Sequence, residues 1–188
     1  MQKVIFIPGN GGGGPTDNWF PYLKDELEKE DLEQLNIKVV ASEFPDNILA
    51  RESYWIPFLK DNLHADEQTI LIGHSSGAIA AMRFAEKNRV LGSVLVGAYH
   101  TDLGMLTEKQ SGYFDRAWDW ESMIKNQAWI IQFASTNDPW IPIEEARLVH
   151  EKLKTEYHEY QDQGHFGGDQ IKLVFPELLE ALKAKFKN

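Results

Sequence analysis

The sequence predicts an α/β fold in which a parallel sheet is covered by helices on both faces. Short β-branched or aromatic segments alternate with longer helical patterns along the chain, and this alternation is typical of βαβ units. The centres of the first five segments contain few polar residues, as expected of strands that are buried on both sides. Because the 188 residues include no repeat or linker, one domain over 1–188 is expected.

Six strands are expected, together with six helical patterns. The expected strands lie at 3–9, 36–44, 69–74, 92–98, 128–135 and 157–161. The expected helices lie near 17–31, 50–64, 76–88, 120–126, 143–155 and 170–187. The long irregular stretch at 99–120 has a length typical of a lid or a substrate-binding loop, and an aromatic-rich surface excursion is the equal alternative.

The composition narrows the classes of partner. The formal net charge of −10 disfavours nucleic acid and anionic membrane surfaces, because both attract Lys and Arg. The chain has no cysteine and no histidine pair with metal-motif spacing, so neither a thiolate site nor another metal or cofactor site is expected. The first residues run directly into a strand rather than a secretory signal, and no apolar run is long enough to cross a bilayer. A cytoplasmic protein is therefore expected.

The segment Gly73-His74-Ser75-Ser76-Gly77 lies where the third expected strand becomes a helix. Gly-x-Ser-x-Gly in this context is the nucleophile elbow, which exposes the serine hydroxyl above the sheet. Glycines at both ends allow the strand and the helix to approach each other. Ser75 is thus the candidate nucleophile, and the N–H of Ser76 is a candidate oxyanion donor in the first helical turn. The alternative is a tight turn without chemistry.

A serine nucleophile needs a base, and the base needs a group that orients it. In this architecture the acid and then the histidine follow later strands. Asp138 follows the fifth expected strand and His165 follows the sixth. Asp162 and Asp169 are alternative acids, but Asp138 alone lies at the carboxyl end of a strand. The remaining histidines are expected to be structural or exposed: His64, His74, His100, His150 and His158.

A glycine-rich loop, "PGNGGGGP", follows the first expected strand and contains a literal G-x-G-x-x-G at Gly9, Gly11 and Gly14. This pattern is the dinucleotide-binding fingerprint. Pro15 and the residues after it delay the helix, whereas a dinucleotide motif begins its helix within the glycines. We therefore interpret the loop as the source of a second oxyanion donor, from Asn10 or Gly11. A dinucleotide-binding oxidoreductase and a flexible turn are the alternatives, and the missing G-K-[ST] excludes a P-loop.

With these motifs placed, the chain resembles the small α/β-hydrolases typified by retinoblastoma-binding protein nine, a family of compact serine hydrolases. The resemblance runs through "IPGNGGG", "ARESYWIPF", "TILIGHSSGAIAAMRFAE" and "GHF". It implies a compact α/β-hydrolase fold of three αβα layers, with six parallel strands in the order 2-1-3-4-5-6. It also implies Ser75 as nucleophile, Asp138 as acid and His165 as base. Ala65 replaces the cysteine of the namesake's Leu-x-Cys-x-Glu pattern, so a retinoblastoma-type partner is not supported.

The sequence thus predicts a serine hydrolase that cleaves a small ester or amide through an acyl-enzyme. The substrate is expected to be a small molecule or a short peptide. The alternative is a non-catalytic binding protein with the same fold. Aromatic residues on loops or near strand ends are candidates for the substrate pocket, although core packing is the more common role for each of them individually. They are Trp19, Phe44, Trp55, Tyr113, Phe114, Trp118 and Trp140.

Overall fold

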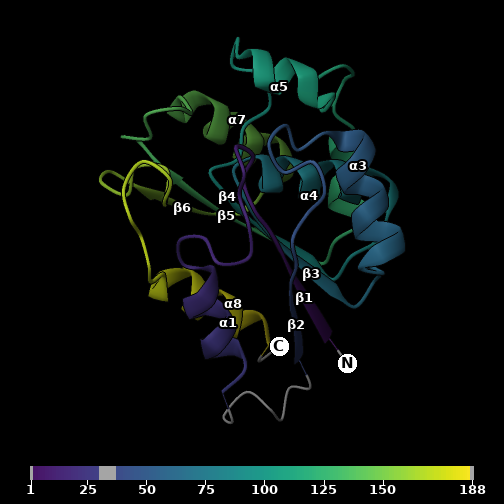
Figure 1. Cartoon of the computed structure of the whole chain (residues 1–188), viewed down its shortest axis with the longest axis vertical. Helices are drawn as coiled ribbons and strands as arrows, with labels where there is room; N and C mark the ends of the chain where they lie inside the picture. The colour runs from purple at the N-terminus through teal and green to yellow at the C-terminus, as the bar shows by residue number, and fades with distance from the viewer. Residues whose placement is uncertain (1, 30–36, 187–188) are drawn as a thin grey trace.

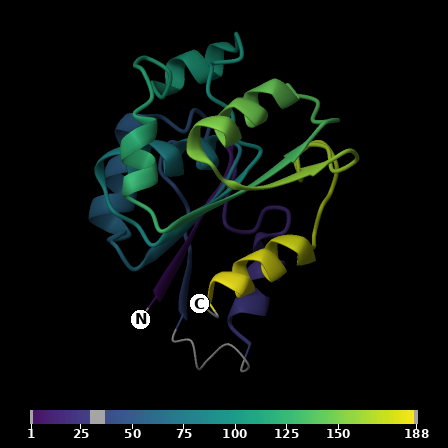
Figure 2. The same ribbon diagram turned by 180° about the vertical axis from the view of Figure 1, so that it is seen from behind.

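The computed structural model describes residues 2–29 and 37–186. Six parallel strands form one sheet in the order β2-β1-β3-β4-β5-β6, which confirms the predicted topology (Figures 1 and 2). The strands are β1 (Gln2–Ile7), β2 (Ile37–Ala41), β3 (Thr69–His74), β4 (Gly92–Val96), β5 (Trp129–Ser135) and β6 (Glu156–Tyr160).

Helices cover both faces of the sheet, so the molecule has the three layers that the sequence predicts (Figures 1 and 2). One face packs against α1 and α8, and the other packs against α3, α4, α6 and α7. The helices are α1 (Phe20–Leu27), α3 (Glu52–Pro57), α4 (Ser76–Lys87), α5 (Leu106–Ser111), α6 (Trp120–Lys125), α7 (Ile143–Leu153) and α8 (Pro176–Phe186), with a π-helical turn η1 (Phe58–Asn62) after α3.

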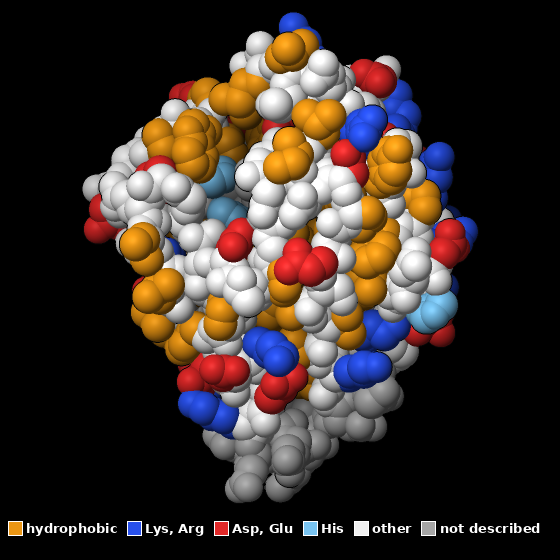
Figure 3. All heavy atoms as spheres, viewed as in Figure 1, with side chains coloured by type: hydrophobic (Ala, Val, Ile, Leu, Met, Phe, Trp, Pro, Cys, Tyr) orange, Lys and Arg blue, Asp and Glu red, His pale blue; other side chains and the backbone are white. Residues whose placement is uncertain are grey.

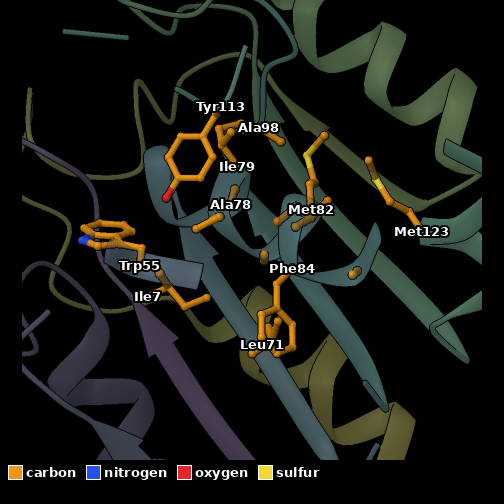
Figure 4. Close-up of a cluster of buried hydrophobic side chains, with 14 of the residues drawn as sticks. Ile7, Trp55, Leu71, Ala78, Ile79, Met82, Phe84, Ala98, Tyr113 and Met123 are labelled. Atoms are coloured by element: carbon orange, nitrogen blue, oxygen red, sulfur yellow. The ribbon is translucent and has the colours of Figure 1, made fainter. Parts of the chain in front are cut away.

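Two hydrophobic clusters lie on opposite faces of the sheet. In β1, Val4 and Phe6 belong to the cluster beneath α1 and α8, whereas Ile5 and Ile7 belong to the cluster beneath α4. This alternation follows from the strand geometry, in which successive side chains point to opposite faces. Figure 4 shows the cluster beneath α4, where side chains from the strands and from α4 meet Trp55, Tyr113 and Met123.

Several expected elements differ from the described ones at their ends. The helix expected at 50–64 is divided into α3 and η1 at Pro57, which has no N–H to donate to a helix. The last helix begins only at Pro176. Helix α5, within the long stretch 99–120, is not among the expected helices. Residues 30–31, 36 and 187 of the expected elements lie outside the described residues.

The arrangement positions the site at one edge of the sheet. All strands are parallel, so their carboxyl ends and the loops that follow them gather at the same edge. Helix α5 lies beyond this edge, at the top of Figure 1. None of the helices in the described ranges has the length and apolar character needed to cross a bilayer.

Candidate active site

Ser75 occupies a strained turn between β3 and α4. Its φ of 56° and ψ of −123° lie in a region that residues other than glycine rarely adopt, and such a conformation costs about 1–3 kcal/mol. A Cβ on Gly73 would lie 2.3 Å from the carbonyl oxygen of Gly77, and a Cβ on Gly77 would lie 2.1 Å from that of Ile7. Both positions therefore require glycine, as the elbow interpretation predicts.

Asp138 and His165 are brought together from the loops after β5 and β6. The distance from His165 Nδ1 to Asp138 Oδ2 is 2.7 Å, and both side chains are only 4% exposed. Asp138 Oδ1 accepts the backbone N–H groups of Trp140 and Ile141 at 2.9 and 3.0 Å. The carboxylate is thus fixed with Oδ2 facing the imidazole. A neutral His165 that donates Nδ1–H to Asp138 has Nε2 free to accept a proton.

The other candidate acids have different contacts. Asp169 Oδ1 accepts the backbone N–H of His165 at 3.1 Å, and Asp162 accepts from the side chain of Gln163. The structure therefore places Asp138, and neither alternative, against the imidazole ring of His165.

His74 supports the backbone of His165. Its Nε2–H donates to the carbonyl oxygen of His165 at 2.7 Å, and the two ring centroids are 4.9 Å apart. Burial, together with the nearby His165, lowers the pKa of His74 to about 3. His74 is therefore neutral at ordinary pH and acts as a fixed hydrogen-bond donor. His74 and His165 both line the cavity that contains Ser75. The other histidines, His64, His100, His150 and His158, do not line it.

A cavity of about 440 Å³ contains Ser75 and His165 in its lining. Figure 3 shows histidine side chains in pale blue at the floor of a hollow with orange hydrophobic side chains around it. A hydrogen bond from Ser75 Oγ to His165 is not among those of the described residues. Such contacts are often long before substrate binds, and both residues line the same cavity.

The glycine-rich loop passes beside Ser75. A Cβ on Gly9 would lie 3.4 Å from the Cβ of Ser75. The N–H of Gly11 already donates to the carbonyl oxygen of Ile48 at 3.0 Å. By contrast, the N–H of Asn10 is not among the backbone donors with a partner in the described residues. Of the two donors that the sequence left open, the geometry therefore favours Asn10 over Gly11.

Glu108 connects the glycine-rich loop to the elbow. This role was not predicted from the sequence. Its Oε1 accepts from Asn10 Nδ2 at 2.7 Å, and its Oε2 accepts from the Tyr99 hydroxyl at 2.6 Å. The Tyr99 hydroxyl lies 3.3 Å from Ser76 Oγ. Burial raises the pKa of Glu108, although its two hydrogen bonds act in the opposite direction. A glutamate between polar residues gives no signal in the sequence that it will be buried.

Of the seven aromatic residues that are candidates for the substrate pocket, only Trp140 lines this cavity. Trp19 and Trp55 are fully buried and donate their indole N–H groups to backbone carbonyls. Large aromatic rings stabilise the fold when buried, and this determines their position more than proximity to a strand end does. The others also pack elsewhere: Phe44 against Trp55, Phe114 against Tyr99, Trp118 against Arg83, and Tyr113 in the core.

The cavity wall is instead formed in part by aliphatic residues that the sequence did not single out. Leu103 and Met105 come from the segment before α5, and Ile141 follows Trp140 in the loop after β5. In the part of the chain that the structure describes, no group of three or more His, Asp or Glu side chains could hold a metal ion. Helix α1 begins at Phe20, well after the glycines, so the loop lacks the helix start of a dinucleotide site.

The fold and the serine turn define an α/β-hydrolase, and solved structures agree. The ydeN gene product of Bacillus subtilis matches with a TM-score of 0.87 and 23% identity, covering 100% of both chains. Est1E from Butyrivibrio proteoclasticus, solved with ferulic acid bound, matches with a TM-score of 0.72 and 11% identity over 98% of this chain and 88% of that one.

The family follows from the sequence comparisons. The family model described as serine hydrolase matches residues 4–184. The chain is also 44% identical over 183 residues to the serine hydrolase RBBP9 of Rattus norvegicus, covering 97% of this chain and 94% of that protein. The chain therefore belongs to the serine hydrolase family, as the resemblance in its sequence suggests, and these relatives support hydrolase activity.

Proposed function

We propose that this protein cleaves a small ester or amide by nucleophilic catalysis, with Ser75 as nucleophile, His165 as base and Asp138 as the orienting acid. One observation carries the proposal. Ser75, on its strained turn, shares a cavity with a histidine whose Nδ1 is held by a buried carboxylate. These are the parts that nucleophilic catalysis by serine requires.

The reaction follows in two halves. Ser75 Oγ attacks the substrate carbonyl carbon while His165 Nε2 takes the hydroxyl proton, which gives a tetrahedral oxyanion. His165 then gives this proton to the leaving alcohol or amine, and the acyl group stays on Ser75. Water attacks the acyl-enzyme with His165 again as base, which releases the acid and restores the serine hydroxyl.

Two further groups support the base in this scheme. Asp138 holds the imidazole in the tautomer with Nε2 unprotonated and stabilises the imidazolium that forms. His74 stays neutral beside it, because its pKa is lowered to about 3 by burial and by His165. The base thus has one anionic partner, and its neighbouring ring adds no competing positive charge.

The oxyanion is proposed to bind between two backbone donors. Ser76 begins α4, so its N–H has no partner within the helix and lies where the helix dipole favours negative charge. The N–H of Asn10 approaches from the loop that passes beside Ser75. Each such donor contributes about 3 kcal/mol to stabilising the transition state.

Esterase and amidase activity can be compared directly. We would measure hydrolysis of p-nitrophenyl butyrate and of the matched p-nitroanilide, with a search for an initial burst. Wild-type protein and the exposed control Ser53→Ala are expected to turn over at least one of the two. Ser75→Ala is expected to be inactive, and Asp138→Asn is expected to lose about 10⁴-fold in kcat. Equal activity in Ser75→Ala would contradict the proposal, and a folded but inactive wild type would favour the binding protein.

A further inference from the structure

Helix α5 buries a charged side chain and exposes an apolar one. Glu108 is 4% exposed, whereas its neighbour Leu106 is 69% exposed. Burying a carboxyl group is unfavourable unless hydrogen bonds compensate, and exposing a leucine forfeits its hydrophobic stabilisation. An arrangement selected for stability alone would place the leucine inside. Stability alone therefore does not explain why Glu108 points inward, and we look for the explanation in the residues that it contacts.

Its contacts connect the two halves of the proposed oxyanion site. One carboxyl oxygen accepts from Asn10 Nδ2 at 2.7 Å, and the other accepts from the Tyr99 hydroxyl at 2.6 Å. Tyr99 in turn lies 3.3 Å from Ser76 Oγ. Asn10 and Ser76 are the two residues whose backbone N–H groups are proposed to bind the oxyanion. Glu108 thus joins both residues through their side chains and leaves their backbone donors free.

The segment that carries Glu108 is fixed on both sides. Glu145 accepts from the backbone N–H groups of His100 and Thr101 on one side of α5. On the other side, the buried Arg83 guanidinium donates to the carbonyl oxygens of Tyr113, Arg116 and Ala117 and lies 3.5 Å from the centre of a Trp118 ring. Glu108 is therefore presented to the site by an anchored segment.

The glycine-rich loop gains most from such a contact. Gly11 and Gly12 have φ values of 73° and 96°, and glycine segments lose much conformational freedom when they are ordered. The backbone bonds from Gly11 and Gly12 to Ile48 and Asn47 hold the loop after Asn10. The Asn10–Glu108 bond holds the side chain of Asn10 itself.

We propose that Glu108 is a positioning residue that ties Asn10 to the elbow and so holds the Asn10 backbone donor beside that of Ser76, in the geometry that binds the oxyanion. This inference rests on the proposed function. A misplacement of about 1 Å in such a site lowers the rate by about 100-fold. Because the donors act on the transition state, loss of Glu108 is expected to lower kcat and leave KM nearly unchanged.

The test compares Glu108→Ala, Glu108→Gln and the control Gln110→Ala, an exposed residue of the same helix. Glu108→Ala is expected to lose about 10- to 100-fold in kcat, with KM within about twofold and the thermal midpoint recorded for each variant. Glu108→Gln is expected to recover most of this loss, because its amide can accept from Asn10 and donate to Tyr99. Gln110→Ala is expected to match the wild type.

A double-mutant cycle provides a readout that a general structural role would not change. Asn10→Ala keeps the backbone N–H but removes its contact with Glu108, so it is expected to lower kcat as Glu108→Ala does. The double variant is then expected to be no slower than either single variant. Effects on kcat that multiply would contradict the inference, as would a raised KM with normal kcat or a Glu108→Gln variant as slow as Glu108→Ala.

Labelling by a fluorophosphonate separates this inference from the proposed function. If wild-type Ser75 is labelled and Glu108→Ala is labelled at least about tenfold more slowly, the result supports both the proposed function and the role of Glu108. If the wild type is labelled and Glu108→Ala keeps the wild-type rate, Glu108 does not position the Asn10 donor, whereas the assignment of Ser75 as nucleophile still stands. If folded wild type is not labelled, the proposed function fails first.

Discussion

Two glycine-rich turns meet at the candidate active site, and they are held in different ways. In the elbow, Gly73 and Gly77 pack so closely that a Cβ on either would lie within 2.3 Å of a backbone oxygen. In the loop after β1, Gly11 has no atom within 4 Å of such a Cβ, and its N–H reaches across to Ile48. Packing between adjacent elements fixes the elbow, whereas hydrogen bonds to distant segments hold Gly11 and Gly12 of the loop.

This difference has a consequence for the site. The elbow holds Ser75 as soon as β3 and α4 pack together, because both elements flank the turn directly. The loop holds Asn10 only when the segments around Ile48 and Glu108 are also in place. One half of the proposed oxyanion site is thus part of the core, and the other half depends on contacts far away in the sequence.

The largest effect is expected at the elbow. Gly77→Ala would place a methyl group 2.1 Å from the carbonyl oxygen of Ile7, which belongs to a central strand and cannot move aside. We expect a loss of more than about 3 kcal/mol in the free energy of unfolding, measured in urea. A variant that unfolds like the wild type would show that packing does not fix this turn.

A second large effect is expected in acid, again on the elbow side. The pKa of His74 is lowered from 6.5 to about 3 in the folded protein, so the fold favours the neutral ring. The resulting stability is present in full above pH 6.5 and is lost as the pH falls toward 3. Each pKa unit corresponds to about 1.4 kcal/mol, so the free energy of unfolding is expected to fall by several kcal/mol over this range.

His74→Asn is the matching variant, because it removes the titrating ring and keeps a polar side chain. Thermal midpoints recorded from pH 7 to pH 4 are expected to fall less steeply for this variant than for the wild type. Parallel curves for the two proteins would mean that His74 does not carry the acid sensitivity.

A smaller effect is expected in the loop. Gly11→Ala meets no neighbouring atom, so its cost comes only from the φ of 73°. This backbone strain amounts to about 1–2 kcal/mol. A loss as large as that of Gly77→Ala, measured in the same urea titration, would contradict the contrast between the two turns.

The smallest effect on stability is expected for the hydrogen bond that connects the Asn47 side chain to the loop. Asn47 Nδ2 donates to the carbonyl oxygen of Gly13 at 3.2 Å, and such a neutral bond contributes about 1 kcal/mol. Asn47→Ala is expected to lower the free energy of unfolding by about this amount and to lower kcat by about threefold, because the loop loosens. Unchanged kcat would mean that the position of Asn10 is set without this anchor.

The two turns also differ in how far the sequence predicts them. The elbow could be predicted because all of its requirements lie within a few residues, between an apolar strand and an alanine-rich helix. The positions of Asp138 and His165 could be predicted because each follows a strand of a parallel sheet. Their roles, and that of Ser75, remain predictions until the chemistry is measured.

The contacts of the loop could not be predicted in this way. The Asn10–Glu108 bond spans 98 positions in the sequence, and α5 is a six-residue helix with a weak pattern. Six of the seven aromatic candidates do not line the cavity that contains Ser75, for a related reason. A ring near a strand end packs inward or lines a cavity according to which helix covers it, and only the tertiary structure determines that.

The most direct test is to label the pure protein with a fluorophosphonate and to locate the adduct by mass spectrometry, with Ser75→Ala and Asp138→Asn in parallel. The proposed mechanism predicts one adduct per chain on Ser75, slower labelling of Asp138→Asn and no adduct on Ser75→Ala. An adduct on another residue, or no adduct on a protein shown to be folded, would contradict the assignment of Ser75 as an activated nucleophile.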